Sequence, residues 1–319
     1  MKKLCGYALL WFVFNLILPL HASPYAFITN QGADSVSVID TQKNEVVKTL
    51  QVGSKPAGVA VTSNGLRCFI SNPESKNISV IDANALEVIS TFAAGEGPLG
   101  IAVGHEDAYL YVADWYEDLL RVYDAQNYQL IAQIAVGESP SGIVVHPNNK
   151  LVFTADRDSN AVSVIENESF TRIAQVQVGE RPFGLAISNS GDYLFTANVA
   201  DDSVTVVDVK TMQIVTTIPV GDTPYAIAVS KDDSRIYVSN QHDDTLSVIA
   251  TNNWQEVERI DIGGFPEGVL AHPNGKYVYI ANWFDNEVAV MDIQSLEILT
   301  RIPTQDGSRA FGIFISGGS

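Results

Sequence analysis

The chain of 319 residues is short of cysteine, and this limits how its fold can be stabilised. Of its two cysteines, Cys5 lies in an apolar N-terminal run that we expect to be removed, which leaves Cys68 alone. A single thiol has no partner for an internal disulfide, even in an oxidising compartment. We therefore expect packing alone to hold the fold together.

The sequence motifs of common catalytic centres are also absent. There is no His-Glu-x-x-His, paired Cys-x-x-Cys, Gly-x-Ser-x-Gly, phosphate-binding glycine loop or haem-attaching Cys-x-x-Cys-His. Beyond residues 1–23, which we expect to be removed, there are four histidines, His105, His146, His242 and His272. His146 and His272 are expected on the face opposite His242, where the three cannot share a zinc ion. We expect no catalytic residue, no metal site and no cofactor.

Basic residues are scarce beside acidic ones. The chain has 19 Lys and Arg against 37 Asp and Glu, and loss of Lys2 and Lys3 leaves 17 against 37, a net charge of −20. Such a surface repels phosphate backbones and anionic lipid. A nucleic-acid partner is therefore disfavoured, whereas cations or basic partners are favoured.

A long apolar run occurs only at the N-terminus. Two lysines precede the apolar residues 4–20 and small residues follow, which is the order of a secretory signal. A membrane anchor would need about 20 uninterrupted apolar residues, but Gly6 and Asn15 break this run. We expect a signal peptide over residues 1–23, a periplasmic or secreted protein and no membrane span after cleavage.

A repeat of 42 residues fills the rest of the chain. A repeat of this length that recurs seven times indicates a repeat architecture before any single motif is considered. The period appears in three registers: Asn30, Asn72, Asp114, Asp156, Asn198, Asn240 and Asn282; Gly53, Gly95, Gly137, Gly179, Gly221 and Gly263; and Pro56, Pro98, Pro140, Pro182, Pro224 and Pro266.

Each repeat predicts four short β-strands. The segments are rich in β-branched and aromatic residues and are separated by Gly, Pro, Asn and Asp, as in 184–187, 193–197, 203–207 and 214–218. Four strands in about 42 residues make one propeller blade. The sequence therefore predicts an all-β, seven-bladed β-propeller over residues 24–319, with four antiparallel strands per blade, and we expect a monomer.

The two chain ends favour a closed ring. Tyr25 to Asn30 matches the second strand of a repeat, so the N-terminal blade lacks its innermost strand. Phe311 to Ser316 matches that missing strand. We expect the C-terminal strand to join the N-terminal blade, because closure removes the exposed edges that an open solenoid would have to cap.

The repeat resembles the YVTN-type β-propeller family over essentially all of Tyr25 to Ser316. The resemblance is carried by Tyr111-Val-Ala-Asp114, Tyr237-Val-Ser-Asn240, Tyr279-Ile-Ala-Asn282 and the Val-Gly-x-x-Pro stretches at 136–140 and 220–224. It implies the propeller fold and a likeness to bacterial periplasmic propellers, some of them implicated in nucleic-acid binding, and to archaeal surface-layer proteins. Lactonases and haem-bearing propellers are implied as more distant relatives.

Features common to all blades are interpreted as structural. The Asn or Asp that ends each second strand is expected to bond turn backbone, as is the recurring Asp that ends the third strand, for example Asp40. A site should then lie where blades differ, in the loops after the second strands and in the crossings between blades, which share one face. The ligand-binding residues predicted there are Trp115, Tyr116, Arg157, Arg181, Phe183, Tyr225, His242, Trp283, Phe284 and Arg309.

Three functions remain open for this face. Exposed aromatic residues amid charges suit a non-enzymatic scaffold that binds a protein, peptide or small ligand. Asp114, Asp156 and Asp158 would serve a metal-assisted, lactonase-like hydrolase, although solvated turns are their simpler interpretation. Stacking of bases on Trp115 and Trp283 would suit single-stranded nucleic acid, if the arginines formed a basic patch. Both tryptophans could instead cap neighbouring blades.

Overall fold

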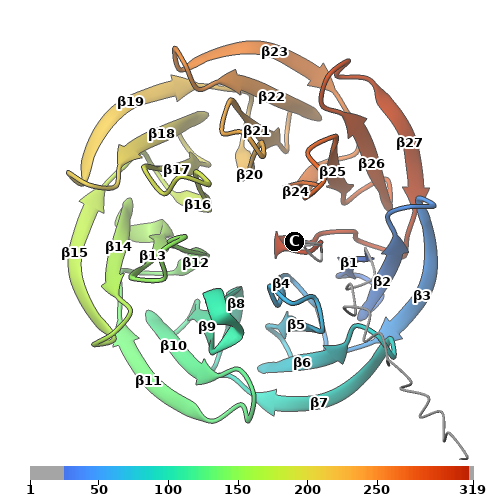
Figure 1. The fold of residues 1–319 in the computed structure, drawn as a ribbon, viewed down its shortest axis with the longest axis vertical. Coiled ribbons are helices and arrows are strands. Elements are labelled where there is room, and N and C mark those ends of the chain that lie inside the picture. The colour runs from blue at the N-terminus through green and yellow to red at the C-terminus, as the bar shows by residue number, and fades with distance from the viewer. Residues whose placement is uncertain (1–24, 316–319) are drawn as a thin grey trace, which may run out of the picture.

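The computed structural model describes residues 25–315, which form a closed ring of seven blades around a central channel (Figure 1). The fold is all-β, as predicted, and two single-turn 3₁₀ helices interrupt it, η1 (His105–Asp107) and η2 (Arg157–Ser159). No helix in the described part of the chain has the length and apolar character needed to cross a membrane. The predicted signal peptide, residues 1–23, lies outside the described residues.

Each blade is a meander of antiparallel strands that runs outward from the channel. Blade 1 contains β1 (Tyr25–Asn30), β2 (Ser35–Asp40) and β3 (Glu45–Gln51), and blade 2 contains β4 (Gly58–Val61), β5 (Arg67–Asn72), β6 (Asn77–Asp82) and β7 (Glu87–Ala93). Blade 3 contains β8 (Pro98–Val103), β9 (Tyr109–Asp114), β10 (Leu119–Asp124) and β11 (Leu130–Ala135), and blade 4 contains β12 (Pro140–Val145), β13 (Leu151–Asp156), β14 (Ala161–Glu166) and β15 (Thr171–Gln177).

The remaining three blades repeat this order. Blade 5 contains β16 (Pro182–Ile187), β17 (Tyr193–Asn198), β18 (Ser203–Asp208) and β19 (Gln213–Pro219), and blade 6 contains β20 (Pro224–Val229), β21 (Arg235–Asn240), β22 (Thr245–Ala250) and β23 (Gln255–Asp261). Blade 7 contains β24 (Pro266–Ala271), β25 (Tyr277–Asn282), β26 (Glu287–Asp292) and β27 (Ile298–Pro303), and β28 (Phe311–Ile313) follows at the C-terminus.

Burial follows the position of a strand within its blade. The second and third strands, such as β17 and β18, are buried on both faces between neighbouring blades, and the buried hydroxyls of Thr196, Ser203 and Thr205 interrupt their apolar residues. The outermost strand, such as β19, is mostly exposed, including its apolar residues Ile214 and Val215. The hydrophobic core is thus a set of layers between blades, with Tyr111, Tyr237 and Tyr279 among its largest buried side chains.

The recurring Asn or Asp at the end of each second strand is structural, and its bonding follows the prediction in part: Asp114 accepts from the amides of Glu96, Gly97 and Tyr116. Asn198 Nδ2 donates to Ser203 Oγ at 3.0 Å and to Thr205 Oγ1 at 2.9 Å, so it joins two strands of its own blade. Asn240 bonds strand hydroxyls in the same way, through Thr245 and Ser247. The Asp at the end of the third strand does cap its turn as predicted: Asp82 Oδ1 accepts from the amides of Asn84 and Ala85.

Glycine in the innermost strands lets neighbouring blades approach backbone to backbone. A Cβ atom added to Gly100 would lie 1.6 Å from the Ser141 carbonyl oxygen, and one added to Gly184 would lie 2.2 Å from that of Tyr225. No larger residue fits these contacts without moving a strand. The innermost strands therefore form a tight inner ring whose side chains line the channel.

The C-terminal segment closes the ring, with one departure from the other blades. It bridges β1 antiparallel at Asn30↔Ser308 and Ala26↔Ile315, which are the ends of a fourth strand for blade 1. The corresponding partners of β17, Pro182 and Ile187, are five residues apart, whereas Ser308 and Ile315 are seven apart. The two extra residues force the middle of the segment to leave β1, and β28 pairs instead in parallel with β4. This detour carries the segment into the centre of the ring (Figure 1).

Cys68 lies in the core as a free thiol. Burial raises the pKa of its thiol well above the ordinary value, so the group is held as a neutral thiol.

Candidate functional site

The loops after the second strands and the crossings between blades meet on one face, as the repeat predicts. Trp115 N donates to the Gly97 carbonyl at 2.9 Å, and Trp283 N donates to the Phe265 carbonyl at 3.0 Å, so each loop is bonded to the crossing that enters its own blade. We call this the loop face. The opposite face carries the hairpin turns between the first and second strands, and we call it the turn face.

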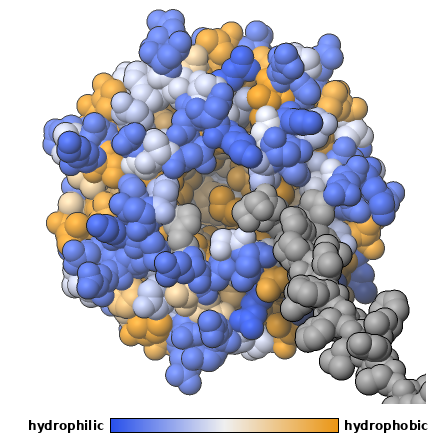
Figure 2. Space-filling view, in the orientation of Figure 1, coloured by the Kyte–Doolittle hydropathy of each residue, from blue (hydrophilic) through white to orange (hydrophobic). Residues whose placement is uncertain are grey.

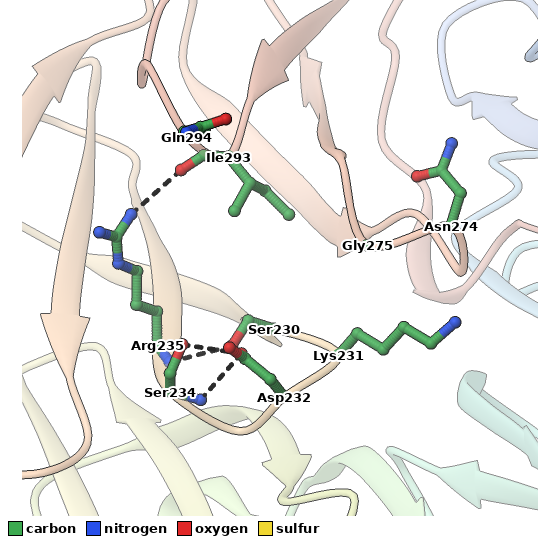
Figure 3. Close-up of a pocket in the computed structure, with 9 residues that line it drawn as sticks. All are labelled: Ser230, Lys231, Asp232, Ser234, Arg235, Asn274, Gly275, Ile293 and Gln294. Atoms are coloured by element: carbon green, nitrogen blue, oxygen red, sulfur yellow. Dashed lines mark hydrogen bonds between the residues drawn. The ribbon is translucent and has the colours of Figure 1, made fainter.

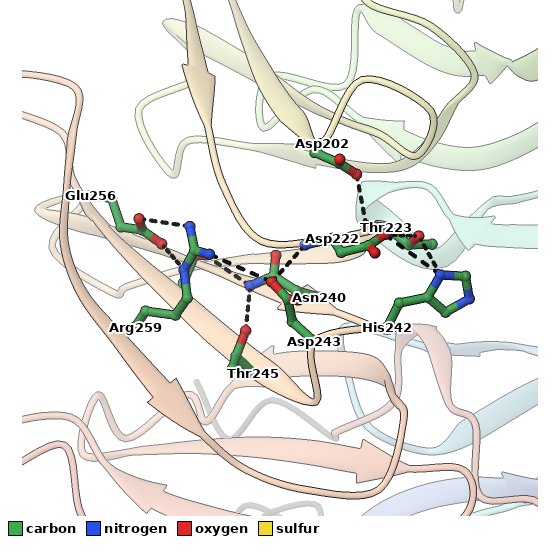
Figure 4. A network of polar contacts seen from close by, with 10 residues as sticks. Asp202, Asp222, Thr223, Asn240, His242, Asp243, Thr245, Glu256 and Arg259 are labelled. Carbon is green, nitrogen blue, oxygen red and sulfur yellow. Dashed lines mark hydrogen bonds and ion pairs between the residues drawn. The ribbon is translucent and has the colours of Figure 1, made fainter.

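Loop side chains fix the shape of each crossing. Asp118 Oδ1 accepts from Ser139 N at 2.9 Å and Asp244 Oδ1 accepts from Phe265 N at 2.8 Å, and Asp202 holds Thr223 in the same way (Figure 4). The amide-bearing residues have φ values of 53°, 59° and 57°, a left-handed conformation that needs such support. Many loop acids are thus acceptors for backbone amides, as their interpretation as turn residues predicted.

Four aromatic residues meet at the centre of the loop face, and we call them the central cluster: Trp115, Phe183, Tyr225 and Phe311. The Phe183 and Tyr225 rings stack with centroids 4.3 Å apart, and Phe311 lies 5.0 Å and 5.8 Å from them. Phe183, Tyr225 and Phe311 are at most 7% exposed, whereas Trp115 is half-buried beside Phe183. The central cluster closes the channel at the loop face, because its rings fill the space between the innermost strands.

A buried ion pair lies beside the central cluster. Arg309 Nε is 2.9 Å from Glu267 Oε2, and Gln241 Nε2 donates to Glu267 Oε1 at 3.1 Å. Arg309 also donates to the Tyr225 hydroxyl and lies over the ring of Tyr225. Burial raises the pKa of the Glu267 carboxyl, and Arg309 opposes that rise. Arg309 thus ties the C-terminal segment to blades 6 and 7.

The other two predicted arginines of this face share the single carboxylate of Asp158. Arg157 Nη1 is 2.7 Å from Asp158 Oδ1, and its guanidinium lies 5.6 Å from the ring centroid of Trp115. Arg181 Nε is 3.9 Å from the same Asp158 oxygen. Arg157, Arg181 and Arg309 therefore do not combine into the basic patch that a nucleic-acid site would require.

A second aromatic group lies nearer the edge of the loop face, and we call it the rim cluster: His242, Phe265, Trp283 and Phe284. Phe284 lies 4.9 Å from both Phe265 and Trp283, and Phe265 lies 5.6 Å from His242. Trp283 is half-buried, but Phe284 is 63% exposed. The rim cluster is thus supported from below and open to solvent above.

His242 links the rim cluster to a polar network (Figure 4). Its Nδ1 is 2.9 Å from Thr223 Oγ1 and 3.5 Å from Asp222 Oδ1. Farther along the same loop, Asp243 accepts from the Asp222 amide at 2.8 Å and pairs with Arg259. These contacts position His242 beside the crossing and leave its ring exposed.

Tyr116 belongs to neither cluster. Its ring lies against Gly97, where an added Cβ atom would come within 2.5 Å of it, and the residue is 73% exposed. The structure thus brings Trp115, Arg157, Phe183, Tyr225 and Arg309 to the centre, brings His242, Trp283 and Phe284 to the rim, and places Tyr116 and Arg181 outside both clusters.

The carboxylates considered for metal-assisted chemistry are occupied within the protein. Asp114 Oδ2 is 3.1 Å from Arg121 Nε and accepts from the Glu96 amide, and Arg121 also pairs with Glu117. Asp156 accepts from the hydroxyls of Thr154 and Ser163, and burial raises its pKa. Within residues 25–315, no group of three or more His, Cys, Asp or Glu side chains is placed to hold a metal ion.

A cleft of about 470 Å³ lies between blades 6 and 7 at the turn face, and its charged side chains also have hydrogen-bond partners within the protein (Figure 3). Ser234 and Ser230 donate to the Asp232 carboxylate and lower its pKa to about 2. Arg235 Nη1 donates to the Ile293 carbonyl, and Lys231 Nζ donates to the Pro273 carbonyl. The cleft is therefore interpreted as a turn network that joins two blades.

Phe265 and Glu267 are recognised in the sequence as varying residues of the crossings, but neither they nor Phe311 are among the predicted ligand-binding residues. Glu267 occupies the crossing position between Pro266 and Gly268, where blade 5 has Phe183 and blade 6 has Tyr225. Because Glu267, Phe183 and Tyr225 occupy equivalent positions in the repeat, the sequence could have predicted that they lie close together. Phe311 was assigned to a regular closing strand, and only the two-residue excess of the C-terminal segment explains its central position.

Comparison with known proteins supports the propeller family at a coarse level. Residues 23–149 match the YNCE-like beta-propeller family, and residues 168–257 match the family of seven-bladed beta-propeller lactonases. Both matches indicate a β-propeller repeat family, and neither extends over half of the chain. No curated protein matches the chain.

Solved structures share the fold at low sequence identity. A protein of unknown function from Desulfotomaculum acetoxidans superposes with a TM-score of 0.84 at 16% identity, covering 93% of this chain and 100% of that one. Hydrazine synthase of Kuenenia stuttgartiensis gives 0.78 at 18%, covering 90% and 100%. The dihydro-heme d1 dehydrogenase NirN gives 0.68 at 16%, covering 90% and 74%. At these identities the likeness shows the fold alone.

Proposed function

We propose that this protein is an exported, non-enzymatic β-propeller scaffold that binds a basic protein or peptide segment across its loop face. The buried rings of the central cluster occupy the loop end of the channel, and this favours an extended partner over a small molecule on that face. The proposal rests on the exposed aromatic residues and on the charge that surrounds them.

The observation that carries this proposal is the exposure of Tyr116 and Phe284, at 73% and 63%. Both occupy the second position after the strand-ending Asn or Asp, where the other blades have Gly32, Glu74, Asp158, Ala200 and His242. The repeat therefore does not require an aromatic residue there. Large aromatic side chains held open to solvent on a rigid ring are typical anchors of protein interfaces.

The charge of the same loops indicates a basic partner. Glu117 and Asp118 follow Tyr116, and Asp285 follows Phe284, in a chain with a net charge of −18. Arg309 is paired with Glu267, and Arg157 and Arg181 share the carboxylate of Asp158, so two carboxylates offset part of the positive charge of the three predicted arginines. A partner with lysines or arginines beside apolar side chains complements this surface.

Panning a library of random peptides of about 20 residues, which reach roughly 70 Å when extended, would test this function. We expect the immobilised chain to enrich peptides that combine basic with apolar residues and whose affinity falls as salt rises. The matched variant Tyr116→Ala/Phe284→Ala should bind the enriched peptides more weakly. Enrichment of acidic peptides, or equal binding by the variant, would contradict the proposal.

Export is proposed from the N-terminal residues 1–23, whose basic, apolar and small segments have the order of a secretory signal. Mass spectrometry of the protein recovered from fractionated cells would test it. We expect a chain that starts near Pro24 in the extracytoplasmic soluble fraction. Recovery of the full N-terminus in the membrane fraction would refute cleavage.

A lactonase-like hydrolase is the second candidate, because residues 168–257 match a lactonase family. Asp114, Asp156 and Asp158 lie outside that matched segment and already have partners. Lactone hydrolysis that depends on a divalent cation, together with a rise in melting temperature when that cation is added, would favour the hydrolase over the scaffold.

A further inference from the structure

The centre of the ring encloses a chamber that the proposed function does not use. It has a volume of about 630 Å³ and is lined by the innermost strands, including Ile101, Ile143, Leu185, Ile227, Val269 and Ile313. In the space-filling view a hollow at the centre of the ring shows hydrophobic residues inside and hydrophilic ones around it (Figure 2). The volume lies within the range of about 300–1,000 Å³ that is typical of small-molecule sites.

The chamber is closed at one end. Phe311 is part of its wall, whereas Phe183 and Tyr225, whose rings contact Phe311 at tilted angles, are not. The central cluster is therefore the floor of the chamber at the loop face. At the other end the lining includes Ser63 and Asn189 from hairpin turns, so the mouth lies at the turn face.

The wall is unusually free of charge for this protein. The chain has 37 acidic residues, yet among the described residues that line the chamber the one formally charged side chain is Lys231, at the mouth. His272 lies at the mouth as well, and its Nδ1 accepts a hydrogen bond from Asn274 N at 3.1 Å, as a neutral ring does. Folding alone does not require this pattern, since side chains that face an open channel could be polar without cost.

We propose that the chamber binds a small molecule with a hydrocarbon chain, which enters from the turn face. The chain would lie along the aliphatic wall with its inner end against Phe311, and a polar end group would remain at the mouth beside Lys231, Ser63 and Asn189. Transfer of the hydrocarbon from water to this wall supplies the driving force, because both surfaces lose unfavourable contact with water.

The fluorescent probe N-phenyl-1-naphthylamine, with decanol as competitor, tests the proposal on the purified chain. We expect one probe molecule to bind per chain with enhanced fluorescence, and decanol to displace it. Folded protein that does not bind the probe, or probe that decanol does not displace, would overturn the proposal.

Two substitutions at Ile313 locate the probe. Ile313 is 53% exposed and lines the chamber, so Ile313→Asp places a carboxylate in the apolar wall and Ile313→Trp fills the space. Each should lower the affinity for the probe by about tenfold or more, since an ion there loses hydration that the ligand cannot replace and a larger ring excludes the ligand. Melting curves establish that both variants are folded.

The control is Ile173→Asp, the same change at a residue that is 54% exposed on the outermost strand β15. It should leave probe affinity unchanged, as should Tyr116→Ala/Phe284→Ala on the loop face. If the loop-face variant lost the probe and the Ile313 variants kept it, the chamber proposal would fail, whereas the loop-face proposal is judged by peptide binding alone.

Discussion

The central and rim clusters are built from similar residues, yet the ring uses them in opposite ways. Phe183, Tyr225 and Phe311 are buried and in contact with one another, and their neighbour Arg309 is paired with a buried carboxylate. In the rim cluster Phe284 stands 63% exposed on a base of Phe265 and Trp283. Departure from a repeat therefore has two meanings in this protein: at the centre it closes the ring, and at the rim it presents a surface.

Removal of the C-terminal segment should cause the largest loss in the free energy of unfolding, because it disrupts the buried centre. Deletion of residues 311–319 takes Phe311 from the central cluster and Phe314 and Ile315 from blade 1, all of them buried. We expect a loss of about 5 kcal/mol or more in the free energy of unfolding, because each buried Phe alone is worth about 3–5 kcal/mol. Denaturant melts measure it, and an unaltered midpoint would rule out the closure described above.

Truncation of one phenylalanine in each cluster should give very different losses in the free energy of unfolding. Phe183→Ala should cost about 3–5 kcal/mol, because it opens a cavity between Tyr225 and Phe311. Phe284→Ala should change the free energy of unfolding by no more than about 0.5 kcal/mol, since its ring is largely in water. Equal costs for the two variants would mean that the rim cluster is packing and not surface.

Arg309 and Arg181 allow the same comparison between a buried and an exposed charged side chain. Arg309→Met leaves Glu267 buried without its cation and should cost about 3 kcal/mol at pH 7. Arg181→Met is the control, because its side chain is 55% exposed and lies 3.9 Å from Asp158; it should change stability by less than about 0.5 kcal/mol.

The cost of Arg309→Met should depend on pH. Burial raises the pKa of Glu267 above the ordinary 4.5 even beside Arg309, and loss of the cation raises it further. A raised folded-state pKa gives stability that is present below about pH 4.5 and is lost as pH rises through the folded value. The deficit of the variant should therefore shrink from pH 7 towards pH 4. A deficit that grows on acidification would contradict the assignment of a buried, ionisable Glu267.

Truncation of either tryptophan should cost less free energy of unfolding than Phe183→Ala and more than Phe284→Ala. Trp115 and Trp283 are both half-buried, the first beside Phe183 and the second beside Phe265. We expect Trp115→Ala and Trp283→Ala each to destabilise by about 1–3 kcal/mol, less than a fully buried ring. Thermal melts of the two variants measure this cost. A variant with the melting temperature of the wild type would show that its tryptophan is a free surface residue.

The repeat made the fold predictable, but the site only in part. Seven units with four strand signals each specify blades, and the missing first strand at Tyr25 indicated closure by the C-terminus. Which varying residues are buried could not be read from the repeat, because Phe183 and Phe284 are both aromatic departures on the same face. Phe183 is buried and Phe284 is exposed because residues 308–315 bring Phe311 to the centre of the ring. That path depends on two extra residues in the segment, and the repeat pattern does not predict where they direct the chain.

The most direct test of the division between a closed centre and an open rim is a paired measurement on Tyr116→Ala/Phe284→Ala. The free energy of unfolding and the dissociation constant for a peptide enriched by the wild-type chain are measured on the same preparation. We expect stability within about 1 kcal/mol of the wild type, as for two surface changes, and binding weaker by about 1–3 kcal/mol, as for the loss of interface hot spots. A destabilised variant, or one that binds the peptide as tightly as the wild type, would contradict the account.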